Sequence, residues 1–250
     1  MPHPDIPLPR LIAHRGLSAH APENTLSAVR AAHAAGIAWV ELDVQLLGDG
    51  TPVIWHDATI RRCSDGRGRL AELDLAAVRR LDAGSWFGDV FLGERMATLA
   101  EMLALLDELA MGVNLELKVN RGRDPLALVE ATLPAVMDVL PPEQRLVSSF
   151  NDTALARARD LAGPDSLALG VLFEAVGRDW RRRCEPVQAL SVHADWKRLS
   201  RMRASEVVNA GYRLLCYTAN DPTAFAPRWH WGVESVISDD PARFAGHLPP

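Results

Sequence analysis

Short apolar segments alternate with segments of helical period along almost the whole chain, and this alternation constrains the fold more than any other feature. The apolar segments are rich in Val, Ile and Leu, which is typical of buried strands. Strands are predicted over residues 10–14, 38–46, 52–56, 112–119, 145–150, 167–173, 189–194, 213–219 and 234–239. Strands that alternate with helices form parallel sheets with crossover helices.

The predicted helices lie between most of these strands. They cover residues 25–36, 99–109, 125–140, 151–163 and 200–211. Asn24 or Thr25 is the expected cap of the first helix, which should end at Gly36. Pro134 is expected to interrupt the third helix, because proline lacks the backbone N–H that a helix interior uses.

Nine strands are one too many for an eight-stranded barrel, and a hairpin explains the surplus. Only residues 47–51 separate the second and third strands, whereas a parallel crossover takes roughly a dozen residues. The Gly-Asp-Gly sequence in this link suits an antiparallel turn. Eight parallel strands remain, so the fold class predicted is α/β, a (β/α)8 TIM barrel, with a doubly wound open sheet as the alternative. The 250-residue length fits a single domain over 1–250.

Residues 57–96 fit no strand–helix unit. This segment is rich in Gly and Arg and has one helical stretch, near residues 71–82. It is expected to be a small insertion after the hairpin, lying over one rim of the barrel.

Composition excludes several classes of protein. The net charge is −5 and no long basic block is present, which argues against nucleic-acid binding. The three widely spaced cysteines, Cys63, Cys184 and Cys216, suit a reducing compartment and make no CxxC metal site. The N-terminus lacks the apolar core of a signal peptide, and no run of about 18 apolar residues is found. A cytoplasmic protein without stable membrane association is expected; the oligomeric state is left open.

Acidic residues on two predicted strands indicate a metal site. Glu41 and Asp43 share one face of their strand, as Glu116 and Lys118 do on theirs, because residues two apart point the same way. Burying unpaired carboxylates together is costly, and one cation serving all three offsets this cost. An all-oxygen ligand set favours Mg²⁺ or Ca²⁺ over zinc.

Two histidines are expected beside these carboxylates. If residues whose numbers sum to about 99 face one another in the hairpin, His56 lies opposite Asp43. His14 ends the first strand, which neighbours the second in a sequential barrel, and active sites of such barrels lie at the carboxyl ends of the strands. With Arg15 and Lys118 as anion ligands, this set suits phosphodiester cleavage. His20 and His193 have no predicted partners, and surface or structural roles are expected for them.

Over residues 11–245 the chain resembles the glycerophosphodiester phosphodiesterase family. The similar motifs, in the family's order, are "AHRG…APENTLSAV", "VELDVQLLGDGTPVIWHD", "LDAGSWFGDVFLGERMATLAEML", "NLELK", "SSF", "YTAN" and "VISDDP". The resemblance implies a (β/α)8 barrel that hydrolyses glycerophosphodiesters to sn-glycerol 3-phosphate and an alcohol, with a divalent cation.

The resemblance also implies a role for each matching position. The metal ligands are Glu41, Asp43 and Glu116, the catalytic residues are His14 and His56, and the phosphate-binding residues are Arg15 and Lys118. Glu23 is interpreted as support for the site, and Asn24 or Thr25 as the helix cap. Tyr217 and Ala97 replace a tryptophan and a proline that are frequent in the family, so the pocket wall near Tyr217 is expected to differ.

Several alternatives stand beside this reading. A phospholipase C or D on a related barrel would need an apolar rim, for which "SWFGDVF" is the only candidate. A metal-dependent amidohydrolase would need a His-x-His pair, which "AHRG" lacks. A non-catalytic barrel that binds glycerophosphodiesters would be expected to lose a histidine or a ligand. The alcohol group, the acid and base assignment of the histidines, and attack by water or by the glycerol 2-hydroxyl are open.

Overall fold

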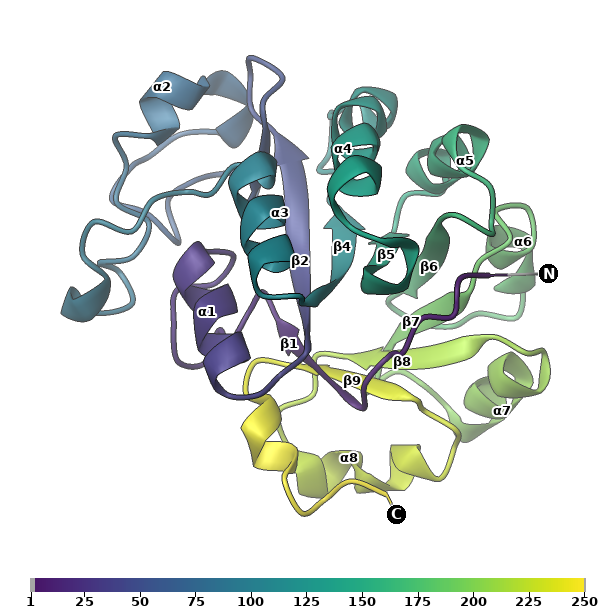
Figure 1. Ribbon diagram of the computed structural model, residues 1–250. Helices are drawn as coiled ribbons and strands as arrows, with labels where there is room; N and C mark the ends of the chain where they lie inside the picture. The colour runs from purple at the N-terminus through teal and green to yellow at the C-terminus, as the bar shows by residue number, and fades with distance from the viewer. Residues whose placement is uncertain (1–2, 250) are drawn as a thin grey trace.

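A closed barrel of eight parallel strands forms the centre of the computed structural model, which describes residues 3–249 (Figure 1). The parallel strands are β1 (Leu11–His14), β2 (Trp39–Leu46), β4 (Gly112–Leu117), β5 (Arg145–Ser149), β6 (Ala168–Phe173), β7 (Ser191–Asp195), β8 (Arg213–Tyr217) and β9 (Ser235–Ser238). The barrel closes because β1 pairs with both β2 and β9. The prediction of a (β/α)8 barrel is therefore confirmed, and the open sheet is excluded.

The remaining strand, β3 (Pro52–Ile54), is not one of the eight parallel strands. It pairs antiparallel with β2 and completes the hairpin. Val44 faces Ile54, and the backbone N–H of Trp55 donates to the carbonyl of Asp43 over 2.8 Å. The predicted register was therefore wrong by one residue, and Trp55, rather than His56, lies opposite Asp43. The shift arises because the N–H of Leu47 bonds to the carbonyl of Thr51, which centres the turn on the middle residue of Gly-Asp-Gly.

Helices surround the barrel in the predicted alternation (Figure 1). The helices predicted are α1 (Leu26–Ala34), α3 (Leu99–Glu108), α4 (Pro125–Val139), α5 (Asp152–Leu161) and α7 (Arg201–Asn209). Two further helices, α6 (Arg181–Cys184) and α8 (Pro222–Trp229), were not predicted. The expected interruption at Pro134 was wrong, because buried Leu133 and Val136 hold α4 against the barrel on both sides of the proline. No helix within residues 3–249 has both the length and the apolar character needed to cross a membrane.

The insertion extends from the rim of the barrel beyond the carboxyl end of β2, where Figure 1 shows it in blue around α2. It contains α2 (Leu75–Val78) and two short 3₁₀ helices, η1 (Leu70–Glu72) and η2 (Asp89–Phe91), so its helical part is shorter than predicted. Asp74 is the N-cap of α2, and its side chain accepts a hydrogen bond from the N–H of Ala77. Trp55 packs with Ile60 and other apolar residues of the insertion, which ties the insertion to the hairpin.

Both apolar and polar side chains are buried in this fold. Ile6, Ile12, Trp39 and other apolar residues form one buried cluster. His193 on β7 is also fully buried, and burial lowers its pKa to about 3. Its Nε2 lies 2.9 Å from Ser191 Oγ, so this histidine is a neutral structural residue, as expected.

Candidate active site

Three carboxylates from two adjacent strands meet inside the mouth of the barrel. Glu41 and Asp43 come from β2 and Glu116 from β4, and the parallel register places Asp43 beside Glu116. All three residues are buried, and each offers an oxygen within 4.8 Å of those of the other two. This spacing permits a single cation to contact all three side chains, and the all-oxygen set suits a hard ion such as Mg²⁺ or Ca²⁺.

Two basic side chains partly neutralise this cluster. Lys118 Nζ lies 2.8 Å from Glu116 and 3.4 Å from Asp43, and Arg15 Nε lies 3.3 Å from Asp43. Burial alone would raise the pKa of Asp43, but Lys118, Arg15, His56 and the hydrogen bond from Asn24 together lower this pKa to about 2. Burial and repulsion by the neighbouring carboxylates raise the pKa of Glu41 well above its usual value and that of Glu116 to about 7. The three acids therefore have an excess of negative charge that a divalent cation would offset.

His14 stands at the carboxyl end of β1, where a tight turn follows it. Arg15 and Gly16 both have left-handed backbone, with φ of 55° and 77°. A Cβ at position 16 would lie 2.6 Å from the side chain of Ala28, so the turn can pack against α1 only with glycine.

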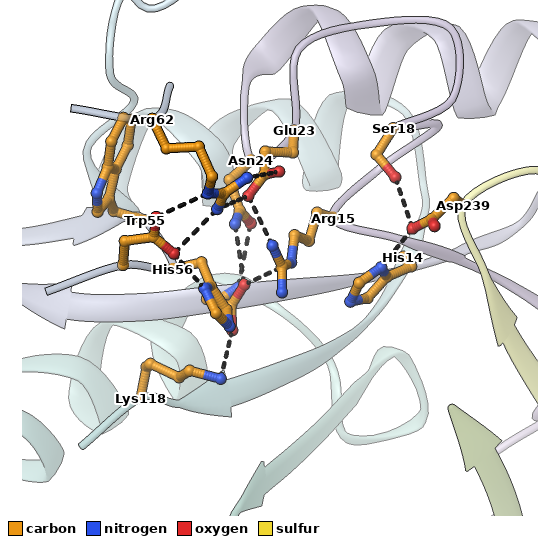
Figure 2. A network of polar contacts seen from close by, with 12 residues as sticks. His14, Arg15, Ser18, Glu23, Asn24, Trp55, His56, Arg62, Lys118 and Asp239 are labelled. Carbon is orange, nitrogen blue, oxygen red and sulfur yellow. Dashed lines mark hydrogen bonds and ion pairs between the residues drawn. The ribbon is translucent and has the colours of Figure 1, made fainter. Parts of the chain in front are cut away.

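The imidazole of His14 contacts two carboxylates. Its Nε2 lies 3.8 Å from Glu41, and its Nδ1 lies 2.5 Å from Asp239 Oδ1 (Figure 2). Asp239 was not predicted as a site residue.

Arg15 turns back toward the carboxylates after this turn. Its guanidinium donates to Glu23 over 2.7 Å and its backbone N–H donates to Glu41 over 3.2 Å. Glu23 therefore contacts Arg15 directly, and its supporting role in the site stays a prediction. Figure 2 shows the contact between Arg15 and Glu23.

Asn24 contacts the site directly and does not cap the helix. Thr25 caps α1 by accepting from the N–H of Ala28. Asn24, with φ of 58°, donates from Nδ2 to Asp43 over 2.9 Å and accepts from the N–H of Asp43 over 3.2 Å. Asparagine tolerates this left-handed backbone better than most residues. The sequence analysis had interpreted Asn24 only as an alternative to Thr25 as the helix cap. Its contact with Asp43 was not predicted.

His56 lies just past β3 and is held by the segment that follows it. Its Nδ1 lies 2.7 Å from Asp57 Oδ1. Arg62, in the insertion, donates to Asp57 over 2.7 Å and also to Glu23 over 2.5 Å (Figure 2). Neither Asp57 nor Arg62 was predicted as a site residue. The acid directly after the histidine was the available signal for Asp57, whereas no local pattern marked Arg62.

The electrostatic surroundings of His56 favour its neutral form. Burial lowers the pKa of His56, and the positive charges of Arg15 and Lys118 add to this effect. Asp43 and Asp57 act in the opposite direction.

A cavity of about 350 Å³ joins these groups. His14 and His56 both line it, together with Arg15, Glu41, Glu116 and Lys118. The other residues that line it include Phe150, Leu172, Glu174, Asp195, Arg198 and Tyr217. The hydroxyl group of Tyr217 donates to the carbonyl of Phe173 over 2.8 Å. The cavity therefore combines two imidazoles, buried acids and three cationic side chains, which can transfer protons and bind an anion.

Known proteins resemble this chain in sequence and in fold. A family model described as glycerophosphoryl diester phosphodiesterase family matches residues 14–243. A glycerophosphodiester phosphodiesterase of Caldanaerobacter subterraneus is 32% identical over 232 residues, 92% of this chain and 94% of the relative. The structure of an Oleispira antarctica phosphodiesterase in complex with the product sn-glycerol-3-phosphate has a TM-score of 0.91 and 36% identity, and the match covers 96% of each chain. The structure of a Thermotoga maritima glycerophosphodiester phosphodiesterase has the same fold, with a TM-score of 0.76 and 23% identity over 96% of this chain and 99% of that one.

Proposed function

Because this chain belongs to the glycerophosphoryl diester phosphodiesterase family, we propose that it hydrolyses glycerophosphodiesters to sn-glycerol 3-phosphate and an alcohol. The observation that carries this proposal is the cavity that holds both His14 and His56 together with the buried acids and Lys118. Its volume of about 350 Å³ suits a small molecule.

We also propose a location and a domain organisation for the protein. The three free cysteines, all of them buried, support a cytoplasmic location. Residues 1–250 are proposed to act as one barrel domain with its insertion.

A divalent cation is the proposed cofactor. Glu41, Asp43 and Glu116 would hold Mg²⁺ or Ca²⁺, which supplies charge stabilisation to the phosphate when it is bound. The raised pKa of Glu116, about 7, supports this assignment, because it reports negative charge that the protein itself leaves uncompensated.

Arg15 and Lys118 are the proposed phosphate ligands. Both carry positive charge inside the cavity and both already contact Asp43, at 3.3 and 3.4 Å. Hydrogen bonds from these side chains to the non-bridging oxygens would stabilise charge that grows on the phosphate during the reaction. Replacing Lys118 by Ala should therefore slow the reaction with every leaving group.

The two histidines divide the proton transfers between them. One accepts the proton of the attacking oxygen, and the other donates a proton to the departing alkoxide. The attacking oxygen belongs either to water or to the glycerol 2-hydroxyl, and the second route forms a cyclic phosphate that water then opens. Phosphorus NMR of the early reaction mixture separates the routes, since only the second produces the cyclic ester.

The test is an assay of the purified protein against glycerophosphocholine, glycerophosphoethanolamine, glycerophosphoglycerol and glycerophosphoinositol, with Mg²⁺, with Ca²⁺ and with EDTA. We expect sn-glycerol 3-phosphate from at least one of these substrates, loss of activity in EDTA, and recovery with either ion. Glu116→Gln should be inactive, whereas Glu108→Gln, which removes an exposed carboxylate at the end of α3, should keep wild-type activity. Hydrolysis of intact phospholipids alone, or binding without turnover, would refute the proposal.

A further inference from the structure

Asp239 directly follows the last barrel strand, and its carboxylate contacts three polar side chains. Its Oδ1 lies 2.5 Å from His14 Nδ1 and accepts from Ser18 Oγ over 3.0 Å. Its Oδ2 accepts from Asn220 Nδ2 over 2.5 Å. Figure 2 shows the carboxylate between Ser18 and the imidazole of His14.

The backbone holds this carboxylate in place as well. The N–H of Asp239 donates to Asn220 Oδ1 over 2.9 Å, and its carbonyl accepts from the N–H of Ala19 over 3.0 Å. The same Asn220 oxygen accepts from Ser238 Oγ over 2.9 Å. Segments after β1, β8 and β9 thus fix one carboxylate orientation. Burial opposes ionisation of this group, but the bonds from His14, Asn220 and Ser18 lower the pKa of Asp239 to about 2, so it is ionised at neutral pH.

Asp239 lies on the side of His14 that faces away from the reaction cavity. It is absent from the wall of the cavity that holds both histidines. It lines instead a separate hollow of about 400 Å³, together with Ser18, Asn220 and one side of His14. The carboxylate therefore does not line the space proposed for substrate, and His14, which lines both cavities, is in direct contact with it.

An ionised carboxylate accepts hydrogen bonds and cannot donate them. Nδ1 of His14 must then carry the hydrogen in its contact with Asp239, which leaves Nε2 as the ring nitrogen that is free to contact a substrate. Nε2 lies on the side of Glu41, at 3.8 Å, and so toward the reaction cavity. In general the partner of one ring nitrogen determines which tautomer a histidine adopts.

We propose that Asp239 is a positioning residue of the hydrolysis: it fixes the tautomer and the ring orientation of His14 so that Nε2 faces the substrate. This inference rests on the proposed function and adds a residue to it. The other histidine has a related arrangement, since Asp57 contacts its Nδ1 at 2.7 Å.

The test compares Asp239→Asn with Asp240→Asn, which removes the same charge one residue further along the chain. The carboxylate of Asp240 contacts His20 at 3.4 Å and does not contact His14. An Asn at position 239 can offer an N–H to the imidazole and select the wrong tautomer. We expect kcat of Asp239→Asn to fall by about 10²-fold or more, toward the ~10⁴-fold loss caused by the same change in a Ser-His-Asp triad, with KM changed less than about twofold. Asp240→Asn should keep wild-type kcat.

A double-mutant cycle tests whether the effect passes through His14. In the His14→Ala background, Asp239→Asn should cause no further loss of kcat, because the residue it acts on is gone. An equal loss of kcat in both backgrounds, or a large rise in KM, would show a general structural role and overturn the proposal.

Nitrogen-15 NMR of histidine-labelled protein with Mg²⁺ gives a readout that needs no turnover. At a pH where the ring is neutral, the His14 signals, identified by their absence in His14→Ala, should show a protonated Nδ1 and a bare Nε2. Asp239→Asn should change this pattern. A bare Nδ1 in the wild type would overturn the proposal. Absence of hydrolysis by the wild type would refute the proposed function, while the spectrum would still decide the contact between Asp239 and His14.

Ser18→Ala covers the case in which Asp239→Asn does not fold. It removes one bond to Asp239 Oδ1 and leaves the carboxylate and His14 in place. We expect a smaller fall in kcat, with the same tautomer as the wild type. A change of tautomer in Ser18→Ala would contradict the assignment of this role to the carboxylate.

Discussion

Removal of the cation should destabilise the protein in a manner that depends on pH. The raised pKa values of Glu41 and Glu116 act in the same direction, and the size of the effect is worked out here for Glu116. Without a cation the pKa of Glu116 is about 7 in the folded chain, against a usual value of 4.5. Burial and repulsion from Asp43 are the main causes, and Lys118 offsets them only in part. The folded state therefore keeps a proton on this carboxylate at pH values where the unfolded chain has lost it.

The sign and size of the effect follow from this difference. Below about pH 4.5 both states are protonated and the group contributes nothing to the pH dependence. Between pH 4.5 and about 7 the folded state binds more protons than the unfolded state, so the free energy of unfolding falls as pH rises. The difference between 4.5 and about 7 corresponds to a loss of about 3 kcal/mol, which is complete above pH 7. A bound cation pairs with the ionised carboxylate and removes this loss.

Thermal unfolding in Mg²⁺ and in EDTA, from pH 5 to pH 8, measures the effect. We expect the difference in Tm between the two solutions to grow with pH and to reach roughly 6–12 °C for a chain of this size. Glu116→Gln should show little difference in Tm at any pH, because it has lost both the titrating group and a ligand. A difference in Tm that is constant from pH 5 to pH 8 in the wild type would refute the reasoning.

Three further predictions concern the site and the core. His14→Ala and His56→Ala should each slow turnover by about 10²–10⁴-fold and retain the cation, as calorimetric titration with Mg²⁺ would show; the variant that lacks the acid should lose less activity with a p-nitrophenyl ester. Loss of cation binding in both variants would show that the imidazoles are metal ligands and would contradict their role in proton transfer. Arg62→Ala should lower kcat by about tenfold, because Arg62 holds the carboxylate that contacts His56; unchanged kinetics would show that this ion pair has no role in turnover. Gly170→Ala should destabilise the fold by about 1–3 kcal/mol in urea unfolding, since a Cβ there would lie 2.5 Å from Nε2 of buried His193; wild-type stability would mean that the core adapts to the methyl group.

The sequence by itself determined the elements and the chemical class of the site. All nine strands were predicted within a few residues, because apolar runs and turn residues act locally. The hairpin followed from a link too short for a crossover, and the count of eight parallel strands followed from the hairpin. The positions of Glu41, Asp43 and Glu116 followed from strand periodicity, because residues two apart must share a face. The roles of the seven site residues stay predictions that the experiments above test.

Only the tertiary structure decided how these parts meet. The hairpin register was wrong by one residue, because the turn hydrogen bond of Leu47 and Thr51, and not the centre of the loop sequence, sets the pairing. Asn24 contacts Asp43, and Asp239 contacts a histidine 225 positions earlier in the chain. Arg62 reaches the site from the insertion, whose arrangement no periodic pattern describes. Contacts of this kind depend on where separate segments end in space once the barrel has closed, whereas propensity and periodicity describe only neighbours along the chain.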